Sequence, residues 1–205
     1  MRSSTPSRIT SEVQEFCRKV HADNDPVYLD VHSSEQDIAL DCFVNVEKRI
    51  AEAGGSIQYG WRIWLWPNTM IEAEFHAVWQ TTDNTLIDIT PAPKGASRVL
   101  FLPDSSREYN GRQINNIRKA LYQKPLVEEF IRLWDEHHEI LNKGERAYMH
   151  GELEFNGKEA LRLDRIKTRT AQIQAFLSPC LCGSFQRLYL CCGNEAYKQW
   201  SKAMS

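Results

Sequence analysis

The sequence has no long apolar run and no recognisable targeting segment. Its most apolar stretch, Ile63–Trp66, is bounded by Arg62 and Pro67, far short of the roughly 20 residues that span a bilayer. The first ten residues, MRSSTPSRIT, contain no apolar core of a signal peptide. We therefore expect a cytoplasmic protein without a membrane-spanning helix.

An excess of basic charge is also missing. The chain has 25 Lys and Arg against 27 Asp and Glu, which gives a formal net charge of −2. Proteins that bind nucleic acid usually carry a basic patch that matches the phosphates. We therefore expect no nucleic-acid partner, and we expect a protein or peptide to be the substrate or partner. The sequence does not indicate an oligomeric state.

Internal repeats and low-complexity tracts are absent, whereas aromatic residues are plentiful. The 205 residues are 42% hydrophobic and include six Trp, seven Tyr and eight Phe. This composition excludes a wholly disordered chain and suits one globular domain, or one domain with a small appendage.

The first half of the chain begins with helical patterns. Apolar residues at helical spacing predict a short helix over 11–22, with Cys17 on its apolar face as a packed core thiol. A short strand is expected over 27–31. A second helix is expected within 34–53, beginning either after Ser34 or after Asp41.

Strand patterns follow. Alternating apolar residues predict strands over 57–66 and 71–80, and a third strand is expected over 85–90 after a hairpin turn at 83–84. A short fourth strand is expected at 99–102. In the 71–80 strand, Ala73, Phe75, Ala77 and Trp79 lie on the face opposite to Glu72, Glu74, His76 and Val78.

The chain after Asp104 is predicted to be mainly helical, with helices over 125–141 and 158–177. This order of elements indicates an α+β fold with a helix packed on an antiparallel sheet. The expected parts are a core over 1–103, a helical segment over 104–177 that packs on the core, and a C-terminal module over 178–205.

Four of the six cysteines form two close pairs near the C-terminus. They are Cys180, Cys182, Cys191 and Cys192. Neighbouring cysteines are poorly placed to form disulfides with each other, and four thiolates in a reducing compartment are typical of a metal site. Two pairs separated by a short loop suit tetrahedral zinc, so we expect one structural zinc ion.

This stretch resembles the SEC-C zinc motif, which begins C-x-C-G-S-G and continues mostly with lysines. The motif ends with a cysteine, then a second cysteine or a histidine, and then a glycine. The similarity covers about residues 179–193 and includes Gly183, Ser184 and Gly193. Uncharged residues, Leu188 and Leu190 among them, stand where the family usually has glycine and lysine, and Arg187 is the only basic residue. The resemblance implies zinc binding and a docking role towards a protein partner.

Cys42, His76 and Asp88 follow one another in the order that a cysteine acyl-transfer enzyme uses. A thiol near a helix N-terminus is activated by the helix dipole. An imidazole on a neighbouring strand takes and returns its proton, and a carboxylate on the next strand orients the ring. In an antiparallel pair, His76 and Asp88 can lie on one face, where we expect them to be hydrogen-bonded.

Residues 34–93 resemble the transglutaminase-like branch of the papain superfamily. That family carries H-A-W on the histidine strand and D-x-T on the aspartate strand, and this chain has His76-Ala77-Val78-Trp79 and Asp88-Ile89-Thr90-Pro91. The resemblance implies a papain-like core over 1–103. It also implies that Cys42 is the nucleophile, His76 the base and acid, and Asp88 the orienting group. Asp41, next to the thiol, departs from the small residue that is usual there.

Two functions of different classes follow from these motifs. The first is a thiol-dependent amide or isopeptide hydrolase, deamidase or transamidase, in which the Cys42 N–H and the Gln36 side chain are candidate oxyanion donors. The second is a non-catalytic adaptor that uses the same fold and the zinc module to bind a protein. Reactivity of the Cys42 thiol distinguishes the two.

Overall fold

The computed structural model describes residues 3–39, 41–92, 95–122, 125–149, 152–184 and 186–202. The fold is α+β, as the sequence predicts, and the chain forms two compact units, Ser3–Lys119 and Ala120–Ser205. None of the described helices has the length and apolar character needed to cross a membrane.

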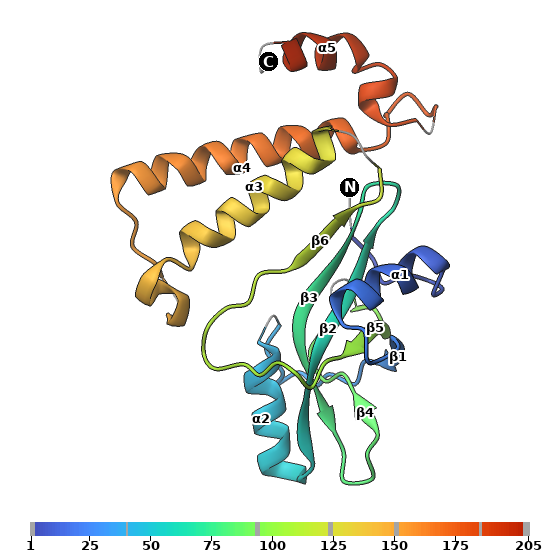
Figure 1. The fold of residues 1–205 in the computed structure, drawn as a ribbon, viewed down its shortest axis with the longest axis vertical. Coiled ribbons are helices and arrows are strands. Elements are labelled where there is room, and N and C mark those ends of the chain that lie inside the picture. Colours follow the sequence, from blue (N-terminus) through green and yellow to red (C-terminus); the bar gives the residue numbers. More distant parts are fainter. Residues whose placement is uncertain are drawn as a thin grey trace. The chain divides into compact units, whose positions relative to one another are not determined.

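The first unit contains two helices and a six-stranded antiparallel sheet (Figure 1). Its elements are α1 (Ser11–Val20), β1 (Val27–Asp30), α2 (Cys42–Ala53), β2 (Ser56–Trp66), β3 (Met70–Gln80), β4 (Leu86–Ile87), β5 (Arg98–Pro103) and β6 (Ile117–Ala120). The predicted helix α1 is present and buries Cys17 completely, and this burial raises the pKa of the Cys17 thiol to about 12. The unit extends past Asp104 because β6, which the sequence analysis did not foresee, pairs with β3.

The sheet closes almost into a barrel. Its strand order is β1-β5-β2-β3-β4, and Asp88, just after β4, forms a bridge to Val31, just after β1. The His32 N–H donates to the Asp88 carbonyl at 2.8 Å, and the Asp88 N–H donates to the Asp30 carbonyl at 3.3 Å. The strand predicted over 85–90 is therefore regular only at Leu86–Ile87, because Asp88 pairs with the opposite edge.

The two faces of β3 have different surroundings. Leu29, Val78 and Phe101 come from β1, β3 and β5, yet they pack in one buried cluster. Because β1 and β3 are not neighbours in the sheet, these side chains point into the barrel. Alternate residues of a strand point to opposite faces, so Ala77 points outwards, where it packs against Val46 of α2. The predicted alternation in β3 is thus present, with α2 covering the outer face.

Helix α2 begins at Cys42, so the alternative beginning after Ser34 is wrong. Asp41 occupies the N-cap position, but its side chain accepts no capping hydrogen bond. The chain before the helix is held by buried Asn45, whose side-chain amide bonds the backbone N–H and C=O of Ile38 at 2.9 and 2.8 Å. Leu40, within the range predicted as helix, lies outside the described residues.

The second unit contains a helical hairpin and the C-terminal module. Its elements are α3 (Pro125–Leu141), η2 (Gly144–Tyr148), α4 (Gly157–Leu177), η3 (Leu188–Leu190) and α5 (Asn194–Lys202). Two forked ion pairs, Arg162 with Glu136 and Arg169 with Glu129, join α4 to α3 in the bidentate geometry that favours arginine. Helix α5 packs on α4 through the aromatic rings of Phe176 and Trp200, 5.3 Å apart.

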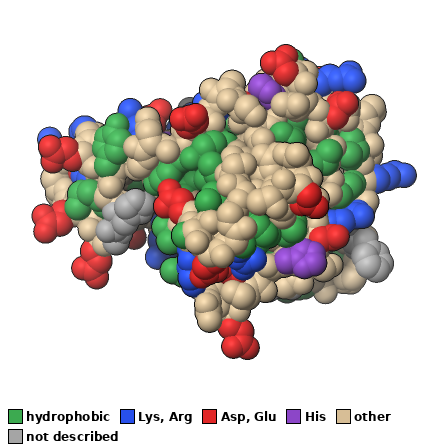
Figure 2. Space-filling model, turned by 90° about the horizontal axis from the view of Figure 1, so that it is seen from below, with side chains coloured by type: hydrophobic (Ala, Val, Ile, Leu, Met, Phe, Trp, Pro, Cys, Tyr) green, Lys and Arg blue, Asp and Glu red, His purple; other side chains and the backbone are tan. Residues whose placement is uncertain are grey.

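The charges of the surface are mixed. On the face shown in Figure 2, acidic and basic side chains are interspersed among uncharged ones. This arrangement agrees with the near balance of 25 basic and 27 acidic residues.

Candidate functional site

His76 and Asp88 meet inside the barrel. The register pairs Trp79 with Ile87, so that Asp88 follows on the inward face, beside Val78 and close to His76. His76 Nε2 lies 3.0 Å from Asp88 Oδ2. The other oxygen, Oδ1, accepts the Thr90 N–H at 3.0 Å. The hydrogen bond that the sequence predicts between the two side chains is present.

Arg62 of β2 is a third member of this cluster. Its Nη2 donates to Asp88 Oδ2 at 2.6 Å and lies 3.0 Å from His76 Nε2. All three side chains are buried, with exposed fractions of 4% for Arg62, 3% for His76 and 0% for Asp88. Sequence reasoning treated Arg62 only as an interruption of an apolar stretch. The alternation along β2 could have identified Arg62, since Trp61 and Ile63 lie on one face of the strand and Arg62 lies on the other.

Charges inside the cluster shift the pKa values of both partners. Burial lowers the pKa of His76 and the Arg62 charge lowers it too, but the Asp88 carboxylate, with a smaller contribution from Cys42, outweighs them and raises it to about 9. Burial raises the pKa of Asp88, whereas the charges and hydrogen bonds of His76 and Arg62 lower it to about 2. At neutral pH the cluster therefore holds two cations around one carboxylate.

Cys42 lies in the buried cluster between α2 and the sheet. It is 6% exposed and packs with Val46, Ala77 and Ile89, which belong to the outer face. His76, in contrast, points inwards, where its ring lies 6.4 Å from the ring of Phe101. The described residues include no hydrogen bond between Cys42 and His76. The structure thus joins His76 and Asp88 by a hydrogen bond, and the participation of Cys42 stays a prediction.

The surroundings of Cys42 are aromatic. Phe43 stacks on Tyr109 with ring centroids 3.8 Å apart and planes 2° from parallel, so the segment that follows β5 covers the beginning of α2. Gln36, the candidate oxyanion donor, is exposed, and its side-chain oxygen accepts from Lys48 at 3.3 Å. The catalytic roles of Cys42, His76, Asp88 and Gln36 stay predictions.

The four C-terminal cysteines converge on one point. The Sγ atoms of Cys180, Cys182, Cys191 and Cys192 all lie within 4.8 Å of one another. Sulfur atoms 2.3 Å from a tetrahedral zinc ion are about 3.8 Å apart, and the Cys182–Cys191 and Cys191–Cys192 separations are 3.4 and 3.9 Å. These cysteines form a site that can hold a metal ion such as zinc.

Short backbone contacts shape this module. The Cys180 N–H donates to the Gln186 carbonyl at 2.7 Å, and the Leu188 N–H donates to the Ser178 carbonyl at 2.9 Å, so a small hairpin holds the first pair of thiols. Gly183 adopts φ of 81°, a conformation that glycine tolerates. A Cβ atom on Gly193 would lie 2.8 Å from the Leu188 carbonyl oxygen, so only glycine fits beside the second pair.

The protonation of the thiols also fits a cation. Hydrogen bonds with Ser184 lower the pKa of Cys182 to about 6. Hydrogen bonds with Cys180, Cys182 and Cys191, followed by the negative charge of Cys180, raise the pKa of Cys192 to about 12, so that a further thiolate is disfavoured beside its neighbours. A bound metal ion removes this conflict, since it is coordinated by thiolates.

No protein-family model, no curated protein and no solved structure matches this chain.

Proposed function

We propose that the chain is a non-catalytic protein-binding adaptor, in which the barrel is a rigid scaffold and the four-cysteine module is the contact element. One observation carries the proposal. Cys42 packs on the outer face of β3 with Ala77, whereas His76 points into the barrel and bonds Asp88. A cysteine nucleophile needs its base within hydrogen-bond reach, and within the described part of the chain no hydrogen bond joins Cys42 to His76.

The burial of the barrel cluster supports the same proposal. His76 and Asp88 are 3% and 0% exposed, and Arg62 occupies part of the space around them. An acyl substrate must reach both the nucleophile and the base. A closed cluster of this kind fits a structural role, in which buried charges are retained because each has a partner.

The C-terminal module has the features of a contact element. Leu181, between two of the cysteines, is completely exposed, and Leu190, next to the second pair, is 51% exposed. Apolar side chains that are exposed on the surface of a small folded module are suited to burial against a partner protein. Zinc in this site would be structural, because four protein ligands leave no position for water.

A second candidate is the thiol-dependent acyl transfer that the motifs imply. It is favoured by the position of Cys42 as the first residue of α2 and by the electrostatic contribution of Cys42 to the raised pKa of His76. Under this function Cys42 attacks the carbonyl, His76 exchanges the proton and Asp88 orients the ring. It requires the thiol to lie within hydrogen-bond reach of the imidazole.

Alkylation of the metal-loaded protein with iodoacetamide at pH 6 separates the two functions, with the labelled cysteines identified by mass spectrometry. The adaptor predicts slow labelling of Cys42 at a rate that His76→Ala does not change. Rapid labelling of Cys42 that falls by an order of magnitude or more in His76→Ala, in a variant that retains its circular dichroism spectrum, would overturn the adaptor in favour of the enzyme.

A further inference from the structure

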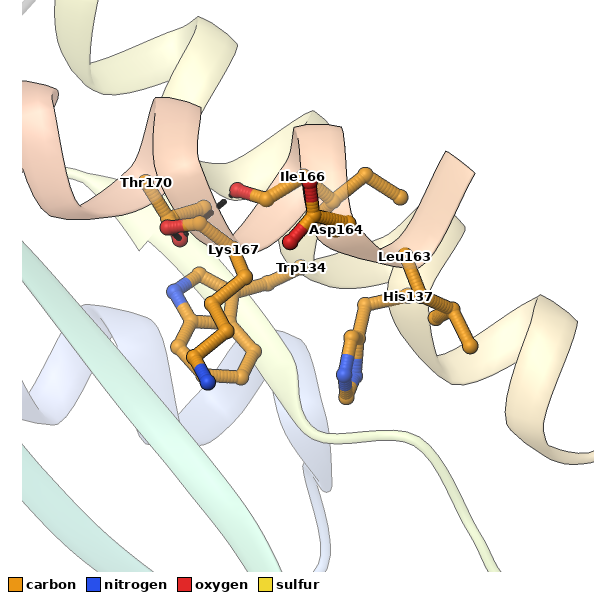
Figure 3. A pocket seen from close by; sticks show the side chains of 7 residues that line it. All are labelled: Trp134, His137, Leu163, Asp164, Ile166, Lys167 and Thr170. Carbon is orange, nitrogen blue, oxygen red and sulfur yellow. Dashed lines mark hydrogen bonds between the residues drawn. The ribbon is translucent and has the colours of Figure 1, made fainter. Parts of the chain in front are cut away.

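The helical hairpin of the second unit contains a pocket that neither proposed function uses. It has a volume of about 220 Å³ and lies between α3 and α4. Figure 3 shows Trp134 and His137 of α3 on one side and residues of α4, including Asp164 and Lys167, on the other. The buried side chain of Ile166 lines it as well.

The pocket is large enough for a small organic molecule and is partly aromatic. An apolar cavity of about 150 Å³ is sufficient to bind benzene, so this pocket can accept a ring together with a few further atoms. Trp134 is 36% exposed, and its ring meets that of His137 edge to face, with centroids 5.5 Å apart. An apolar side chain of a ligand would cover the exposed indole.

Two charges of opposite sign line the same pocket. Asp164 and Lys167 are three residues apart on α4, and both are exposed. Among the described residues neither side chain has an ion pair, whereas Arg162 and Arg169 of the same helix are each bound to a glutamate of α3. The pocket therefore offers one carboxylate and one ammonium group to a ligand.

We propose that this pocket binds a small zwitterion with a large apolar side chain, such as a free aromatic amino acid. The ligand's ammonium group pairs with Asp164, its carboxylate pairs with Lys167, and its side chain lies against Trp134. Small-molecule sites usually have a mostly apolar lining with a few precisely placed polar groups. The two charges give specificity, because a ligand that lacks either group leaves one of them unpaired.

Titration calorimetry on the full-length, metal-loaded protein tests this site with L-phenylalanine, phenethylamine and 3-phenylpropionate. The last two compounds lack the carboxylate and the amine, respectively. We expect L-phenylalanine to bind with Kd of about 1 mM and each analogue at least about 10-fold more weakly. Lys167→Gln should weaken the binding of phenylalanine about 10-fold and leave the binding of phenethylamine, which has no carboxylate, unchanged. Asp164→Asn should weaken the binding of phenylalanine about 10-fold and leave the binding of 3-phenylpropionate, which has no amine, unchanged.

Arg165→Gln is the matched control, because it removes a cation from the exposed surface of the same helix without touching the pocket. It should leave the binding of phenylalanine unchanged. The proposal is overturned if phenylalanine shows no heat of binding up to about 10 mM. It is also overturned if both analogues bind as tightly as phenylalanine, or if Arg165→Gln weakens binding as much as Lys167→Gln does.

Discussion

Arg62 and His76 approach the same carboxylate oxygen, Asp88 Oδ2, at 2.6 and 3.0 Å inside the barrel. His76 Nε2 also lies 3.0 Å from Arg62 Nη2, but one nitrogen cannot donate to Asp88 and accept from Arg62 at the same time. The raised pKa of His76 favours donation to Asp88. Arg62 and His76 then share one acceptor, and the cluster ties β2 and β3 to the residue that closes the barrel.

Removing Arg62 should destabilise the first unit strongly. Arg62→Met leaves Asp88 with one partner fewer in a site that water does not reach, and loss of one member of a buried ion cluster costs about 3 kcal/mol. Arg107→Met is the control, because the half-exposed Arg107 lies 3.7 Å from Asp104 and should cost less than about 1 kcal/mol. Urea unfolding measures both values. Equal, small losses in the two variants would show that the cluster contributes little.

Stability should depend on pH through His76. Its pKa is raised from 6.5 to about 9 on folding, so its contribution is complete below pH 6.5 and is lost as the pH rises through 9. The pKa of Asp88 is lowered from 3.8 to about 2, so its contribution is complete above pH 3.8 and is lost as the pH falls through 2.

The free energy of unfolding of the wild type minus that of His76→Gln isolates the histidine. This difference should be largest between pH 4 and 6.5 and should shrink towards pH 9. A difference that increases with pH would mean that His76 is neutral in the folded protein.

The sequence predicts much of the sheet because β2 and β3 have clear alternation, and residues that alternate on a half-buried sheet are strongly constrained. It does not predict β6, whose residues Ile117–Ala120 include Arg118 and Lys119. Arg118 is accommodated there because Glu72 of β3 accepts its Nε at 2.8 Å, a partner that lies far away in sequence.

The candidate site was harder to predict than the strands. The proximity of His76 and Asp88 could be predicted, since the pairing of β3 with β4 places both side chains on the inward face of the sheet. The face on which α2 packs could not be foreseen, because Ala77 and Trp79 on one side and Val78 on the other are all apolar. Compared with H-A-W, the additional residue Val78 places Trp79 on the face opposite to His76, and Trp79 indeed meets Arg49 of α2 at 5.5 Å.

The four-cysteine module should contain one zinc ion per chain. Elemental analysis of the purified protein should give about one equivalent, and Cys182→Ser should lower it to well below one half because a thiolate ligand is lost. Cys42→Ser is the control and should retain the metal, since Cys42 belongs to the barrel unit. Equal metal contents in both variants would count against this site.

A chain that ends after Tyr122 should fold without the second unit. Residues 3–119 form a compact unit that contains the nearly closed sheet except for Ala120 at the end of β6, so we expect a cooperative thermal transition and a retained near-ultraviolet signal from the buried Trp61. A chain that ends after Leu177 should be less stable in its helical hairpin, because Phe176 loses its contact with Trp200. A truncated barrel without a cooperative transition would contradict the division into two units.

The distance between Cys42 and His76 decides between the adaptor and the enzyme, and a crystal structure of the metal-loaded protein measures it directly. We predict that the Cys42 sulfur lies beyond van der Waals contact, more than about 4 Å from either ring nitrogen of His76, and that the ring points into the barrel towards Phe101. A sulfur atom in contact with the imidazole would contradict the adaptor and establish the catalytic set that the sequence motifs imply.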